Sequence, residues 1–294
     1  SLFYTTPYGS EMKKLFLLVM GIAAAYAPNN TEAATKLKMQ TRPPATCAGS
    51  RTFALSGPID LKNVHANAVT IGNDSTLYVQ IGGGSAATTL LFGPLGAVAN
   101  MAAIKNRTKS QAGALDKEQI VDPLVSLEQY LPAQAAGISS QPEIIVTPFV
   151  AYLRPKKSDL VERRVVLEVQ CDGWKGWYSY HLQGIPAEKL GMEMTEQEYL
   201  DYQTQLQSAQ KTLISLFQAD ASGKLAVTGY NKISSWILNP YFSSPFPQAI
   251  IGEFDGRTVL LGQGEIDKNQ YLFAFMKGMH LFDAGQLEIG EAWD

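Results

Sequence analysis

The chain has 294 residues, of which 46% are hydrophobic and 17% are charged, and its formal net charge is −3. This length supplies enough apolar material for one sizeable core or two small ones. The near-neutral charge balance excludes the clustered lysine and arginine surface that nucleic-acid binding requires, so no nucleic-acid partner is predicted.

Residues 12–27, MKKLFLLVMGIAAAYA, have the three-part plan of a secretory signal peptide. Two lysines follow Met12, an apolar run comes next, and residues 25–27 fit the A-x-A cleavage pattern. The exact cleavage position stays open because Pro28, which follows directly, is a poor first residue. A buried helix is the alternative interpretation. If the signal peptide is real, residues 1–11 lie upstream of the true start and carry no function.

The stretch after the signal peptide, residues 28–47, is polar, contains three prolines and shows no apolar period. This composition predicts a flexible leader. Cys47 ends the leader, and Cys171 is the only other cysteine. An even cysteine count in an exported protein is compatible with one disulfide, and two buried thiols are the alternative.

Residues 48–130 are predicted to form an N-terminal β region that also contains a Gly/Ala-rich segment. Short β-rich runs at 52–55, 68–71 and 76–81 are bounded by turn-forming residues, which predicts three strands. A polar stretch from residue 105 to residue 118 is compatible with a helix. The connector at 131–142 then separates this region from the second half.

Residues 82–104 read GGGSAATTLLFGPLGAVANMAAI and carry no charge. The first glycines match a dinucleotide-binding fingerprint, but the next acidic residue is Asp116 and Gly93-Pro94 interrupts the helix that should follow. No nucleotide cofactor is therefore predicted. The run is long enough to cross a bilayer, and its small residues permit close helix packing. We expect an apolar helical segment over 85–104, either buried in the core or in contact with a membrane or partner.

A serine nucleophile is the catalytic alternative. Ser85 stands one residue short of a G-x-S-x-G motif, and His280 could serve as its base in an allowed chain order. A lone histidine among apolar neighbours is more often structural, so no catalytic residue is predicted. The chain has no HExxH, CxxC or calcium-loop motif, and no metal or other cofactor is predicted.

Residues 143–294 are predicted to form an α+β region that packs with 48–130 as one domain. The run 143–153 reads as a strand, but Pro148 within it predicts an edge strand or a bulge. The alternating run 165–171 ends at Asp172-Gly173, and a second such run ends at Asp255-Gly256. Asp-Gly after an alternating run indicates a β-hairpin with a two-residue turn.

A long amphipathic helix is predicted at about 195–222. Thr195 and Glu198 form a capping box, apolar residues recur at spacings of three and four from Tyr199 onward, and Gly223 provides the stop. Strands, one long helix and further strands, without regular βα alternation, predict an α+β fold with a mostly antiparallel sheet.

The absence of a convergent catalytic set favours a non-enzymatic function. We expect an exported bacterial envelope protein, in the periplasm or outer envelope, that acts by binding or assembly with an envelope protein or a small ligand. A secreted serine hydrolase using Ser85 is one alternative. A membrane-associated assembly built on residues 82–104, including a homo-oligomer, is the other. The candidate binding residues are aromatic side chains expected to be exposed on a hairpin face or in a proline-rich loop: Trp177, Trp236, Tyr241 and Phe242.

Overall fold

The computed structural model describes ten stretches of the chain, all within one compact unit, Met39–Asp294. The described residues are 40–49, 51–59, 68–81, 102–113, 120–131, 144–155, 159–226, 228–234, 246–262 and 277–292.

The fold is α+β, as predicted, and is built on an 11-stranded mixed sheet. The strands are β1 (Phe53–Leu55), β2 (Val69–Ile71), β3 (Asn73–Ile81), β4 (Ile144–Pro155), β5 (Leu160–Cys171), β6 (Trp174–Pro186), β7 (Gly229–Ser234), β8 (Phe246–Phe254), β9 (Arg257–Leu261), β10 (Met279–Phe282) and β11 (Glu288–Ala292). The helices whose two ends both lie within the described residues are η1 (Ala45–Cys47), α4 (Pro123–Tyr130), η3 (Ala187–Gly191) and α5 (Glu196–Ala221).

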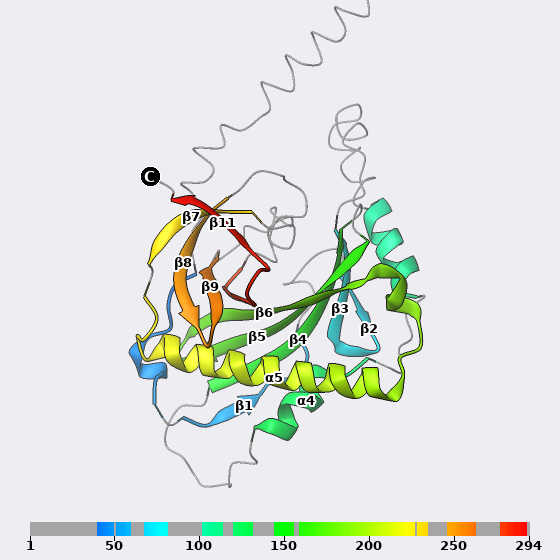
Figure 1. Ribbon diagram of the computed structural model, residues 1–294. Helices are drawn as coiled ribbons and strands as arrows, with labels where there is room; N and C mark the ends of the chain where they lie inside the picture. The colour runs from blue at the N-terminus through cyan, green and yellow to red at the C-terminus, as the bar shows by residue number, and fades with distance from the viewer. Residues whose placement is uncertain are drawn as a thin grey trace, which may run out of the picture. The chain divides into compact units, whose positions relative to one another are not determined.

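The strands follow the order β11-β7-β8-β9-β10-β6-β5-β4-β3-β2, and β1 pairs with β4 off this path. Most pairs are antiparallel, but β1 and β3 lie parallel to β4, and β10 lies parallel to β6. Figure 1 shows α5 crossing β4, β5 and β6 with α4 beside it, and both helices contact this part of the sheet. The long helix therefore covers one face of the sheet.

Both predicted hairpins are confirmed. Each turn holds two consecutive residues at positive φ, 48° and 79° at Asp172-Gly173 and 51° and 72° at Asp255-Gly256. This pair of left-handed conformations matches the twist of the flanking strands. The two-residue turn at Asp172-Gly173 also sets the β5–β6 register, in which Cys171 lies opposite Trp174.

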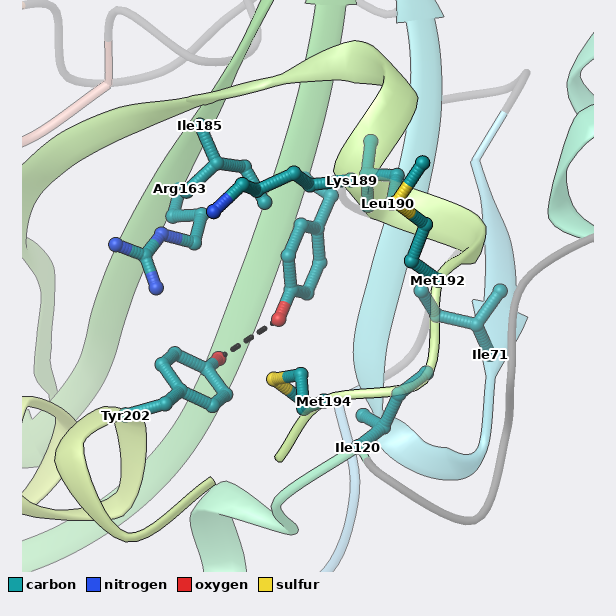
Figure 2. Close-up of a pocket in the computed structure, with 10 residues that line it drawn as sticks. Ile71, Ile120, Arg163, Ile185, Lys189, Leu190, Met192, Met194 and Tyr202 are labelled. Carbon is teal, nitrogen blue, oxygen red and sulfur yellow. Dashed lines mark hydrogen bonds between the residues drawn. The ribbon is translucent and has the colours of Figure 1, made fainter. Parts of the chain in front are cut away.

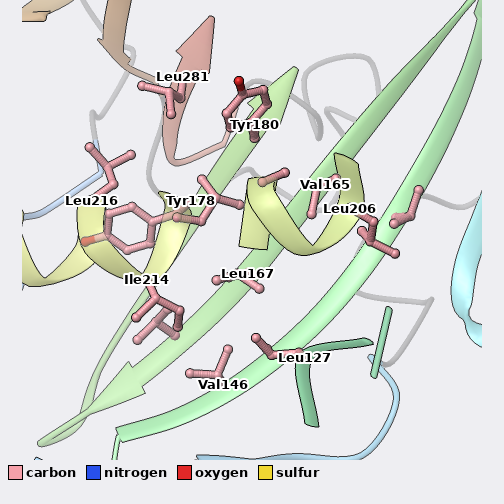
Figure 3. Close-up of a cluster of buried hydrophobic side chains, with 14 of the residues drawn as sticks. Leu127, Val146, Val165, Leu167, Tyr178, Tyr180, Leu206, Ile214, Leu216 and Leu281 are labelled. Atoms are coloured by element: carbon pink, nitrogen blue, oxygen red, sulfur yellow. The ribbon is translucent and has the colours of Figure 1, made fainter. Parts of the chain in front are cut away.

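The long helix begins and ends where the sequence predicts. Thr195 is the N-cap, its hydroxyl accepts from the Glu198 amide, and the Glu198 carboxylate accepts from the Thr195 amide at 2.9 Å. The apolar stripe of α5 packs on the sheet, and Leu206, Ile214 and Leu216 share one buried cluster with Leu167 of β5 (Figure 3). Each fully buried leucine of this kind contributes about 1.5–3 kcal/mol through removal of apolar surface from water.

Pro148 lies in the interior of the sheet, and the predicted edge strand or bulge is wrong. The alternate residues Ile144 and Val146 direct their backbone polar groups toward β1, since the Ile144 amide donates to Thr52 and the Val146 carbonyl accepts from Ser56. The Pro148 nitrogen faces the same side. It lies in the gap after β1 ends opposite Val146 and before β3 begins opposite Val150, so its missing N–H leaves no ladder bond unmade.

The Gly/Ala-rich segment predicted at 85–104 lies mostly outside the described residues, which resume at 102. Residues 102–112 are helical and include much of the polar stretch expected to form a helix. In the described part of the chain, no helix combines the length and apolar character that crossing a membrane requires.

The N-terminal stretch 40–48, which we call the strap, packs against the sheet. The Gln40 side chain bonds both backbone groups of Trp177, accepting from its amide at 2.8 Å and donating to its carbonyl at 3.4 Å. Arg42 forms an ion pair with the buried Asp220 carboxylate and donates to the Leu225 carbonyl at 3.0 Å. Residues 40–47, the part of the predicted leader 28–47 that the structure describes, are therefore held by partners in the fold.

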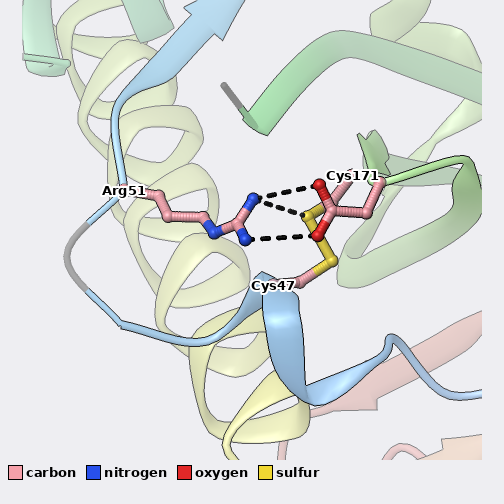
Figure 4. Close-up of a disulfide and its surroundings, with 4 residues drawn as sticks. Cys47, Arg51 and Cys171 are labelled. Carbon is pink, nitrogen blue, oxygen red and sulfur yellow. Dashed lines mark hydrogen bonds and ion pairs between the residues drawn. A yellow bond between two sulfur atoms is a disulfide. The ribbon is translucent and has the colours of Figure 1, made fainter. Parts of the chain in front are cut away.

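The strap ends in a disulfide between Cys47 and Cys171, with the two Cα atoms 5.9 Å apart. Figure 4 shows the Arg51 guanidinium beside this bridge, where it donates to Cys171 Sγ at 3.6 Å and to both carboxylate oxygens of Asp172 at 3.2 Å. The disulfide, one of two possibilities left open by the sequence, is present. It joins the strap to the end of β5.

Candidate functional site

Most of the predicted site residues are not described. Ser85, Trp236, Tyr241 and Phe242 lie outside the described residues, so their suggested roles stay predictions. Trp177 lies on the sheet face opposite the α5 side, as its register requires, but it is buried rather than exposed.

The burial of Trp177 has a clear cause. Only 2% of the residue is exposed, its ring meets the Phe149 ring edge-on with centroids 5.3 Å apart, and its indole N–H donates to Glu168 at 2.9 Å. Leu77 and Val166 belong to the same apolar cluster. The second face of the sheet therefore has an apolar layer of its own, and Trp177 belongs to it.

The same face carries a buried polar group, which we call the histidine cluster: Glu162, Arg164, His181 and His280. The Glu162 carboxylate accepts from Arg164 at 2.9 Å and lies 2.7 Å from His181 Nδ1. His181 Nε2 lies 3.0 Å from His280 Nδ1. An ionised Glu162 accepts from His181 Nδ1–H, which leaves His181 Nε2 to accept from His280. This chain of hydrogen bonds orients both rings.

Burial sets the protonation states in the histidine cluster. It raises the pKa of the Glu162 carboxyl, against the opposing effect of Arg164. Burial also holds the pKa of His181 well below its ordinary value, and the positive charge of Arg164 lowers that pKa further. His181 is therefore neutral in the folded protein near pH 7. His280, the base of the hydrolase alternative, is 1% exposed and bonded to this neutral ring.

We expect the depressed pKa of His181 to make the protein less stable in mild acid. Below about pH 6.5 the unfolded chain binds a proton at this histidine that the folded protein does not bind. This group's contribution to the free energy of unfolding therefore falls as pH drops, by up to about 1.4 kcal/mol per pH unit. Urea unfolding at pH 7.5, 6.5 and 5.5 checks this, with His181→Asn as the non-titrating comparison. Parallel pH profiles for the two proteins would contradict it.

Figure 2 shows a separate site on the α5 side of the sheet, which we call the tyrosine pocket. Its centre is a hydrogen bond of 2.9 Å between the hydroxyl groups of Tyr152, on β4, and Tyr202, on α5. Arg163 of β5 and Lys189 of η3 supply two cationic side chains. The remaining lining is apolar and comes from β2, β6, η3 and the connections around them: Ile71, Ile120, Ile185, Leu190, Met192 and Met194.

The tyrosine pocket has a polar side and an apolar side. In Figure 2 the Arg163 and Lys189 head groups lie to one side of the tyrosine pair, and Met192, Ile71 and Ile120 lie to the other. The cavity volume is ≈ 70 Å³. An apolar cavity of roughly 150 Å³ accepts benzene, so the pocket as it stands accommodates the end of a short chain. Unbranched methionine side chains can adapt to a larger occupant.

Burial also fixes the state of the two hydroxyl groups. It raises the pKa of Tyr152, and it raises the pKa of Tyr202 well above its usual range. Both hydroxyls are therefore protonated near pH 7 and serve as neutral hydrogen-bond donors.

No protein-family model, curated protein or solved structure matches this chain.

One group of potential metal ligands coincides with the disulfide. Among the described residues, the one cluster with ligand atoms at metal-binding separation consists of Cys47, Cys171 and Asp172. The two sulfur atoms are bonded to each other, and a metal requires thiolates. This cluster therefore does not provide a metal centre while the disulfide is intact.

The tyrosine pocket leaves little trace in the sequence. Tyr202 belongs to the apolar stripe of the predicted helix, and Tyr152 lies one residue before the end of the strand predicted for 143–153, but no sequence spacing brings the two residues together. Six parts of the chain contribute to the lining, so tertiary contacts alone create the site. The one local signal is Met192 and Met194, two flexible apolar residues just before the helix cap.

Proposed function

We propose that this chain is an exported, non-enzymatic protein of the bacterial envelope that binds a small, largely apolar ligand in the tyrosine pocket. The observation that carries the proposal is the pocket's composition, six apolar side chains around a buried tyrosine pair. Mostly apolar concave sites with a few placed polar groups are typical of ligand binding.

Two features support export. Residues 12–27 have the pattern of a signal peptide. The Cys47–Cys171 disulfide is consistent with an oxidising compartment outside the cytoplasm, where such bonds form and persist. The two features are independent, since one lies in the sequence ahead of the fold and the other lies inside the fold.

The two alternative functions depend on residues that the structure does not describe. The hydrolase requires Ser85 beside His280, and the membrane assembly requires the apolar run 82–104, described only at its C-terminal end. The tyrosine pocket depends on neither segment. It is therefore the site that the described residues support best.

Filling the pocket should weaken ligand binding. Leu190→Trp adds a large side chain at a partly exposed position of the lining, and we expect it to weaken the binding of a short-chain probe, octan-1-ol or octanoate, by at least about tenfold. Binding is measured by nuclear magnetic resonance through the labelled methyl groups of Met192 and Met194. Leu200→Trp, on the exposed face of α5 and outside the lining, is the matched control. The proposal fails if neither probe shifts these methyl signals in the unmodified protein.

A further inference from the structure

The side chains of the tyrosine pocket offer hydrogen-bond donors and no carboxylate. Arg163 and Lys189 can only donate, and the six apolar residues neither donate nor accept at ordinary strength. Lys189 lies at the rim, with its side chain 59% exposed and 3.7 Å from the Glu198 carboxylate, so solvent and Glu198 weaken its charge. Arg163 is therefore the principal cation of the site.

Only some of the N–H groups of Arg163 are used to hold its side chain in place. Its Nε and Nη2 donate to the Gln183 carbonyl at 3.4 and 3.3 Å, and Nη2 also donates to the Gln205 side chain at 3.3 Å. Its guanidinium carbon lies 5.2 Å from the centre of the Tyr202 ring. Within the described stretches these contacts use Nε and Nη2, and the two N–H groups of Nη1 have no hydrogen bond. A guanidinium fixed in this way can present Nη1 to a bound acceptor with little loss of side-chain freedom.

The tyrosine pair adds a third donor. Two hydroxyl groups that share one hydrogen bond retain one further O–H hydrogen, because each hydroxyl can donate once. Tyr152 and Tyr202 are 6% and 4% exposed, so this hydrogen is largely shielded from bulk water. A buried donor that finds no acceptor carries a free-energy cost, which a ligand acceptor in the pocket would relieve.

We infer that the ligand is a small amphipathic anion, such as a short-chain carboxylate, with its charged group on Arg163 and the tyrosine pair and its apolar chain against the isoleucine and methionine side. This inference rests on the proposed function, since it names the ligand class of the same pocket. The donor-only polar side matches a group that accepts several hydrogen bonds and carries negative charge. The apolar side matches an alkyl chain.

The experiment compares octanoate with octan-1-ol, which has an alkyl chain of the same length and no charge. Affinities are measured by titration with the Met192 and Met194 methyl signals as the readout, at a pH where octanoate is ionised. The unmodified protein should bind octanoate at least about tenfold more tightly than octan-1-ol. Arg163→Gln should remove most of this preference by weakening octanoate alone, while octan-1-ol binds almost unchanged.

Arg257→Gln is the matched control for charge. Arg257 also packs on a tyrosine, 5.4 Å from the ring centre of Tyr180, but it is not part of the pocket lining. This variant should retain the full octanoate preference. Tyr202→Phe removes a pocket hydroxyl and should weaken octanoate by a smaller factor than Arg163→Gln does.

The outcomes separate the two proposals. If octanoate and octan-1-ol bind equally well at the methionines, the pocket is a ligand site and the anion inference is wrong. An equal loss of both probes in Arg163→Gln would also overturn it, because that loss shows collapse of the pocket and not loss of a charge contact. If neither probe binds the unmodified protein, the proposed function itself fails.

Discussion

Replacing Cys47 and Cys171 together by alanine should lower the free energy of unfolding by about 2–5 kcal/mol. The two cysteines are 124 residues apart, so the bridge removes a large loop-closure entropy from the unfolded chain. In the folded protein the bridge ties the strap to the end of β5. Without it, the contacts of Gln40 and Arg42 must hold the strap alone.

Urea unfolding monitored by tryptophan fluorescence measures this effect. The unmodified protein treated with a thiol reductant is the control, since it loses the same covalent link without any change of sequence. The alanine variant and the reduced protein should unfold at similar urea concentrations. A loss smaller than about 1 kcal/mol in both would show that the strap's polar contacts suffice without the bridge.

Glu162→Ala should destabilise the protein by about 3–5 kcal/mol. Both Glu162 and Arg164 have side chains no more than 2% exposed, and the carboxylate lies 2.8 Å from the guanidinium and 2.7 Å from His181. Removing Glu162 takes away a carboxylate that compensates the buried charge of Arg164 in a medium that solvates charge poorly. The neutral ring of His181 also loses the acceptor that orients it.

Two further variants make this test specific. Glu162→Gln retains the shape of the side chain and one acceptor oxygen, and we expect it to be less destabilising than Glu162→Ala. Glu193→Ala, at an exposed position, should change the free energy of unfolding by no more than about 0.5 kcal/mol. Circular dichroism during urea unfolding gives all three values. If Glu162→Ala lowers the free energy of unfolding no more than Glu193→Ala does, the ion pair of the histidine cluster does not stabilise the fold and the prediction is wrong.

The parts of the fold that could be predicted are those that local chemistry decides. An Asp-Gly pair after an alternating run has one favourable backbone solution, and it fixes the register of every residue in the hairpin. The capping box at Thr195 and Glu198 likewise places the start of α5 through contacts only three residues apart. In both cases the interacting residues are neighbours in the sequence, so the local sequence pattern is enough to predict the structure.

The parts that could not be predicted depend on contacts between distant residues. Gln40 belongs to a polar, proline-containing stretch, and its order comes from Trp177, 137 residues away. Pro148 is tolerated inside the sheet because a gap lies beside it, between the end of β1 opposite Val146 and the start of the β3–β4 pairing at Val150. The exposure predicted for Trp177 requires a sheet with one solvent-exposed face, whereas both faces carry a cluster of buried apolar side chains.

β10 comes late in the chain but lies in the middle of the sheet. This strand lies between β6 and β9 and joins the β2–β6 half to the half that contains β7, β8, β9 and β11, yet only β11 follows it in the chain. A nascent chain therefore presents two open strand edges, on β6 and on β9, until residues 279–282 leave the ribosome. Such edges invite pairing with other chains. The two halves can therefore become one cooperative unit only after residues 279–282 have been made.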